Sequence, residues 1–361
     1  SGIRNSFIGY GAGANATTTN YSIAIGQFAL GLGVLTGDQN IAFGNGAGYD
    51  LTSGTYNILQ GYQAGYNATT ANNTIAIGRA AIGTGVLTGT DNTAIGQNAG
   101  TDLTSGTYNN FMGYQAGFNA TTASNTIAIG RAAIGLGVLT GTSNIAIGQS
   151  AGYDLTSGAY NNFIGESAGT NVTTGTYNIL QGFSAGFNAT TASYAIGIGR
   201  SAFGLGVLTG SYNTAVGYQA GYDLTSGTYN NFMGYQAGFN ATTANNNVAI
   251  GQSALGLGVL TGDDNTAIGY GAGQDLTSGT YNFFGGALAG ANATTPTGTT
   301  AVGRLAFGTG VLTGNYNTAV GYAAGEDLTS GTYNNFMGYR AGYNATTATN
   351  TVAIGNQAIG L

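Results

Sequence analysis

The side chains that could do chemistry in this chain of 361 residues are few, and they recur at fixed intervals. Carboxylates could bind calcium or act as acids. Six aspartates occupy equivalent positions in the repeat, usually 52 residues apart: Asp50, Asp102, Asp154, Asp223, Asp275 and Asp327. If the chain is a stack of 17–18-residue coils, such neighbours lie about 14 Å apart, too far to share a metal or a substrate bond. The spacing therefore favours turn residues at an exposed corner.

The sequence contains few residues that could catalyse a reaction. The chain has no histidine, cysteine or lysine, so the usual bases and nucleophiles are missing. Carboxylates adjacent in sequence, such as Asp263 and Asp264 or Glu326 and Asp327, point in different directions on a strand. We expect no enzyme activity, no catalytic residue, no metal ligand and no cofactor.

Asparagine, arginine and tyrosine recur in the same way. Eight asparagines lie in Asn-x-Thr sequons, which permit N-glycosylation but also suit turns: Asn15, Asn67, Asn119, Asn171, Asn188, Asn240, Asn292 and Asn344. Four separated arginines favour solvation over contact with an aspartate of a neighbouring chain: Arg79, Arg131, Arg200 and Arg304. A tyrosine series favours packing at an interface or groove over sugar binding: Tyr56, Tyr108, Tyr160, Tyr177, Tyr229, Tyr281 and Tyr333.

These residues are carried by a short, unbroken repeat. A glycine, here called position 0, recurs every 17 or 18 residues from Gly9 to Gly355, and position +3 is always alanine. Representative structural residues of this pattern are Gly113, Ala116, Gly130, Ala133, Gly148 and Ala151. A period this short predicts a solenoid, in which each repeat contacts only its neighbours.

The residue types around the glycine predict the shape of one coil. Positions −1 and +3 are apolar while +1 is mostly polar or aromatic, so we expect the strand to bend at the glycine, with −1 and +3 facing inward. Asparagine at −4, as in Asn92 and Asn109, suits a turn. Hydroxyls near +9 form a column that predicts bonding along the stack: Ser53, Thr70, Thr88, Ser105, Thr122, Thr140 and Ser157.

The spacings run 17, 17, 18, which defines a three-coil super-repeat of 52 residues. The prediction is an all-β fold: a parallel β-solenoid, or β-roll, of about 21 coils forming one continuous domain over residues 1–361. A coil of this size encloses little volume. Self-association would therefore bury apolar residues left over at −2, such as Phe111, Phe163, Phe232 and Phe336.

Composition excludes other classes. The net charge of −6 argues against nucleic-acid binding, which needs basic patches. No apolar run approaches the ~20 residues of a membrane span.

The strings Asn-Thr-Ala-Ile-Gly-x-x-Ala, at Asn92 to Ala99 and Asn265 to Ala272, resemble the head repeats of trimeric autotransporter adhesins. The Thr-Ser-Gly or Thr-Thr-Gly before the next asparagine also resembles tail-fibre proteins that precede a chaperone-of-endosialidase domain. The resemblance implies a left-handed parallel β-roll, a homotrimer and display outside the cell.

We therefore expect an extracellular structural or adhesive fibre subunit, at a cell surface or virion tail, whose partners are its own copies and a surface receptor or glycan. Assembly would give a homotrimer or a head-to-tail filament. The sequence begins and ends within a coil, which predicts an internal segment of a longer fibre or a subunit that stacks end to end. The alternative is an ice-binding solenoid that uses the Ser/Thr column.

Overall fold

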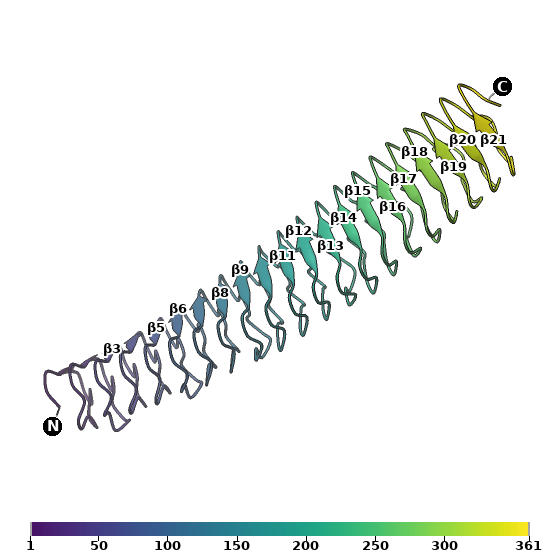
Figure 1. Ribbon diagram of the computed structural model, residues 1–361. Helices are drawn as coiled ribbons and strands as arrows, with labels where there is room; N and C mark the ends of the chain where they lie inside the picture. Colours follow the sequence, from purple (N-terminus) through teal and green to yellow (C-terminus); the bar gives the residue numbers. More distant parts are fainter. Residues whose placement is uncertain (1, 360–361) are drawn as a thin grey trace. The chain divides into compact units, whose positions relative to one another are not determined.

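The structure, a computed structural model, describes residues 2–359. Contacts divide the chain into two compact units, residues 1–178 and 179–361. Each unit is a stack of coils with one three-residue strand per coil, and the described residues contain no helix (Figure 1). The prediction of an all-β parallel solenoid is confirmed, whereas one continuous domain stays a prediction.

Strands of neighbouring coils pair in parallel and in register, as Ile127 pairs with Ile145. The strands of the first unit are β1 Ser6–Ile8, β2 Ile23–Ile25, β3 Ile41–Phe43, β4 Ile58–Gln60, β5 Ile75–Ile77, β6 Thr93–Ile95, β7 Asn110–Met112, β8 Ile127–Ile129, β9 Ile145–Ile147 and β10 Asn162–Ile164. Those of the second are β11 Ile179–Gln181, β12 Ile196–Ile198, β13 Thr214–Val216, β14 Asn231–Met233, β15 Val248–Ile250, β16 Thr266–Ile268, β17 Phe283–Gly285, β18 Thr300–Val302, β19 Thr318–Val320, β20 Asn335–Met337 and β21 Val352–Ile354.

The glycine at position 0 ends each strand and bends the chain, as predicted. Gly113 has φ 136°, a conformation that side-chain-bearing residues rarely adopt. A Cβ built on Gly113 would lie 2.5 Å from the carbonyl oxygen of Gly130 in the next coil. Glycine is therefore needed both for the bend and for the close approach of coils. Ala116, Ala133 and Ala151 at +3 are fully buried, which confirms their inward assignment.

The assignment of the strand faces was wrong. The middle residue of each strand, at −2, points inward, so Phe111 and Phe163 are fully buried. Met112 at −1 is 40% exposed, and Ile129 is 36% exposed. Successive residues of a strand point to opposite faces, so the outward residues are −3 and −1. The phenylalanines at −2 thus fill the core and are not left over for association.

The core explains why the super-repeat has three coils. The ring of Phe111 fills space beside two glycines at +4, because a Cβ on Gly100 or Gly117 would approach it to 2.8 or 2.7 Å. In the next coil the strand carries the small Ala128, and Ile134 at +4 is the large buried residue instead. Large residues therefore alternate between two sides of the interior, and the remaining coil type has small residues at both positions.

A ladder of buried asparagines also links the coils. The Nδ2 group of Asn109 donates to Oδ1 of Asn92 at 3.0 Å and to the carbonyl of Ala123 at 2.7 Å. Its Oδ1 accepts from the backbone N–H of Thr126 at 3.1 Å. The predicted turn role of asparagine at −4 was wrong, because the left-handed residue is the preceding one, Tyr108, with φ 59°.

The first prediction tests the corrected strand faces. Phe111→Ala should lower the free energy of unfolding by about 3–5 kcal/mol, because it removes a buried ring and leaves a cavity. Met112→Ala, one residue along the same strand, should cost far less because that side chain is already partly hydrated. Urea unfolding of both variants checks the order, and equal losses would contradict it.

The second prediction tests the ladder. Asn109→Asp replaces a buried donor by an oxygen that faces two other oxygens, so it should cost at least ~3 kcal/mol at neutral pH. The loss should shrink at acidic pH, where the carboxyl is protonated and donates one bond. Asn110→Asp, at the next residue and on the exposed face of β7, is the matched control. An equal effect of the two substitutions on thermal unfolding would refute the ladder.

Candidate functional site

The six aspartates lie on separate coils, where they are half-buried. The described residues contain no group of three or more acidic side chains able to hold a metal ion. The carboxylate of Asp102 accepts a hydrogen bond from the Thr84 hydroxyl, and Oδ1 of Asp327 accepts one from Oγ1 of Thr309 at 2.6 Å. These bonds tie one coil to the next.

Burial shifts the titration of several carboxyls. It raises the pKa above the ordinary value of 3.8 at four positions: Asp50, Asp154, Asp223 and Asp275. For Glu326, burial and then the charge of Asp327 raise the pKa, while Arg340 lowers it. Since the four aspartates occupy equivalent positions on separate coils, their shifts follow from a repeated corner and do not mark a single acidic centre.

The sequon asparagines are also part of the coil-to-coil bonding. In six of them Nδ2 donates to the carbonyl 17 residues later, as Asn119 does to Leu136 at 2.7 Å; the others are Asn15, Asn67, Asn188, Asn240 and Asn292. An N-linked amide keeps one N–H, so this bond is compatible with a glycan. Glycosylation therefore stays an untested alternative to the turn interpretation.

Two of the predicted arginines lie over aromatic rings of a neighbouring coil. The guanidinium carbon of Arg200 is 5.4 Å from the centre of the Phe183 ring, and that of Arg304 is 5.8 Å from the Tyr322 ring. These cation–π contacts hold the side chains along the stack. All four predicted arginines are exposed, which agrees with the favoured interpretation that they are solvated. Nothing in the single chain tests the alternative, contact with aspartates of a neighbouring chain.

The hydroxyl column near +9 is exposed, as Ser105 and Thr122 show. One member of the column bonds along the stack as predicted, because Oγ1 of Thr88 donates to the carbonyl of Thr104 at 3.5 Å. The preceding residue, at +8, makes shorter bonds of the same kind. Oγ1 of Thr104 donates to the carbonyl of Thr121 at 2.9 Å, and Oγ1 of Thr225 donates to that of Thr242 at 3.0 Å.

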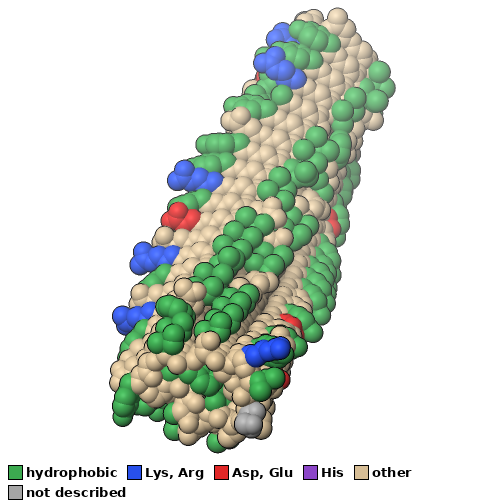
Figure 2. All heavy atoms as spheres, turned by 90° about the vertical axis from the view of Figure 1, so that its left-hand side faces the viewer, with side chains coloured by type: hydrophobic (Ala, Val, Ile, Leu, Met, Phe, Trp, Pro, Cys, Tyr) green, Lys and Arg blue, Asp and Glu red, His purple; other side chains and the backbone are tan. Residues whose placement is uncertain are grey.

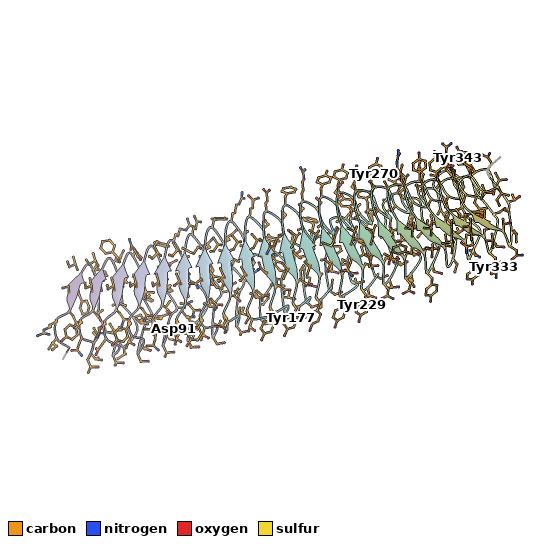
Figure 3. The ribbon with its side chains drawn as sticks, turned by 45° about the horizontal axis from the view of Figure 1, so that its top comes forward. Asp91, Tyr177, Tyr229, Tyr270, Tyr333 and Tyr343 are labelled. Atoms are coloured by element: carbon orange, nitrogen blue, oxygen red, sulfur yellow. The ribbon has the colours of Figure 1, made fainter. Side chains whose placement is uncertain are left out.

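Tyrosines at position −5 are exposed and stack along the coils. Tyr108 is 59% exposed and Tyr229 55%. The rings of Tyr160 and Tyr177 are parallel within 3° with centres 4.8 Å apart. Tyr229 and Tyr333 project from one edge of the second unit, whereas Tyr270 and Tyr343 project from the opposite edge (Figure 3). The tyrosines therefore pack on one another along the coils, and the predicted packing at an interface or groove stays a prediction.

The outward face of the strands is the largest feature that sequence reasoning missed. Here called the sheet face, it consists of the −3 and −1 residues of the strands within each unit. Its members include Ile41, Phe43, Ile129 and Ile147, all at least 36% exposed. Among the described residues, no strand contains a charged side chain. Figure 2 shows that apolar side chains on the molecular surface gather in rows.

The signal for this face was present in the sequence. In the strand Asn110–Met112 the phenylalanine is flanked by an asparagine and a methionine, and alternation places those two on the same, outer side.

Comparison with known proteins finds no matching family model and no matching curated protein. Residues 2–359 also contain no helix with the length and apolar character to cross a membrane.

The third prediction follows from the aspartates. Because their pKa is raised on folding, the folded state binds protons more readily than the unfolded chain, and their contribution to stability rises as pH falls. From pH 7 towards 3.8, these four carboxyls should make the protein more stable. A variant with asparagine at all four positions should lose this gain. If the melting temperatures of the wild type and the variant changed equally with pH, the raised pKa of these four aspartates would be contradicted.

Proposed function

We propose that this chain is a structural or adhesive segment of an extracellular fibre, such as an adhesin head or shaft, a tail fibre or a surface filament, and that it has no catalytic activity. The observation that carries the proposal is the use of its polar groups. Asparagine, threonine and aspartate side chains bond one coil to the next, while outward side chains repeat as columns along each unit. This arrangement suits a scaffold that displays an extended repeated surface.

Self-association is the second part of the proposal, and the sheet face supports it. Parallel sheets are normally covered on both faces, and their strands are apolar on both sides. Here strands such as Ile145–Ile147 read Ile-Ala-Ile, yet Ile147 is 36% exposed in the single chain. A second copy could cover this face without burying a charge. The resemblance to trimeric adhesins is the reason for proposing that three copies associate.

The proposal includes a second kind of partner, a surface receptor or a glycan, which the assembled fibre would bind. The ice-binding alternative rests on the exposed Ser/Thr column near +9. Serine replaces threonine there in every third coil, as at Ser53, Ser105 and Ser157, so the column is not a regular row of threonines. A thermal-hysteresis measurement separates the two roles, since a structural fibre gives none.

Light scattering of the purified chain tests the assembly. The wild type should have three times the chain mass, and Ile147→Lys should shift it towards monomer by placing a charge on the sheet face. Val138→Lys is the matched control, because Val138 is apolar and 55% exposed but lies off the strands. A monomeric wild type would overturn the assembly, and equal effects of both substitutions would overturn the choice of face.

Antibody labelling of intact source cells or virions tests the location. Labelled fibres on the outer surface are expected, and label confined to the cell interior would overturn the proposal.

A further inference from the structure

We propose that the exposed tyrosines at position −5 form a site of oxidative coupling, in which dityrosine bonds link successive coils of one chain. The best-formed site is the stack of Tyr194, Tyr212 and Tyr229 in the second unit.

The geometry of this stack brings the phenols together. The ring centres of Tyr194 and Tyr212 are 4.9 Å apart with planes within 5°, and those of Tyr212 and Tyr229 are 5.0 Å apart with planes within 2°. The three residues are 45%, 48% and 55% exposed, so a small oxidant or a radical mediator can reach them. Their exposure also leaves the rings room to tilt until two ortho carbons meet.

The backbone shows that tyrosine is not the residue that this position favours. Tyr194, Tyr212 and Tyr229 have φ of 56°, 63° and 58°, a left-handed conformation that is costly for a bulky residue. Other coils of the unit place Asn246 or Gly298 here, and both types suit such angles. Since the ring is neither buried nor favoured by the backbone, its stacked side chain is the reason for its presence.

The composition leaves tyrosine as the residue for covalent linkage. The chain contains no cysteine for disulfides and no lysine for amide cross-links, but it has 24 tyrosines. A sugar-binding role fits the stack poorly. Sugars bind to the exposed face of an aromatic ring, whereas here the ring faces are turned towards one another and the edges point outward.

The coupling balances as a two-electron oxidation. Each phenol loses its hydroxyl hydrogen as one proton and one electron, and the two phenoxyl radicals form one C–C bond between ortho carbons. Both rings regain aromaticity when the ortho hydrogens move to the oxygens. Hydrogen peroxide, acting through a haem peroxidase, accepts the two electrons and two protons and is reduced to two water molecules.

The arginines of the chain allow a direct test. The purified chain is treated with hydrogen peroxide and a soluble haem peroxidase, denatured, and cleaved after arginine. Because Arg200 lies between Tyr194 and Tyr212, these tyrosines fall in separate peptides, 132–200 and 201–304. We expect the two peptides joined in the monomeric fraction, lighter by two hydrogen atoms than their sum, with dityrosine fluorescence.

Conservative variants make the test specific. Tyr212→Phe keeps the stacked ring but has no phenol, so it should reduce the joined peptide to background, whereas Tyr229→Phe should retain it. Tyr222, whose ring stacks on Phe239 at 5.0 Å, is an internal control that should form no link to that neighbour.

Three results would overturn the proposal: tyrosines oxidised without the joined peptide, a joined peptide unchanged in Tyr212→Phe, or links found only between chains in a mixture of isotopically light and heavy protein. The bonds form within one chain, so this outcome is independent of the proposed assembly and location.

Discussion

The close contact between successive coils at position 0 is the constraint on which the rest of the structure depends. A Cβ on Gly96, Gly113 or Gly130 would lie 2.5 or 2.6 Å from the carbonyl oxygen of the next coil's glycine. Neighbouring coils can therefore approach closely enough for parallel strand pairing only if this position has no side chain. The same glycine, with φ near 130°, turns the chain out of the strand.

With the coil separation set in this way, both the interior and the surface become columns. Inside, asparagines bond to asparagines one coil away, and phenylalanine fills the space beside a glycine of its own coil and one of the preceding coil. Outside, tyrosines stack, and the sheet face is uncharged and carries exposed apolar residues such as Phe43 and Ile147. Each column repeats its chemistry at every coil or every third coil, so each unit presents extended repeated surfaces. This organisation is what favours a fibre.

The sequence predicted the solenoid, the bend at glycine and the buried alanines, because each depends on contacts that recur with the period itself. It was less informative about which side chains point into the core. Ile129 and Phe111 are both apolar, and only the alternation within a three-residue strand decides that Phe111 points inward. The role of Asn109 was also hidden, because its partners Asn92 and Ala123 lie in adjacent coils and a turn reading accounts for the residue type equally well. The sheet face was missed because the residues at −1 were expected to point inward, which also left the phenylalanines at −2 on the outside.

The most direct test of the central constraint compares alanine at two position-0 glycines with similar φ. Gly113 and Gly355 have φ of 136° and 122°, but the Cβ of Gly113 would meet the next coil, while nothing described lies within 4 Å of that of Gly355. The measurement is the free energy of unfolding of Gly113→Ala and Gly355→Ala. The close-contact account predicts that Gly113→Ala costs well beyond the ~1–3 kcal/mol of backbone strain alone. If Gly113→Ala were no more costly than Gly355→Ala, the contact between coils would not be what requires glycine.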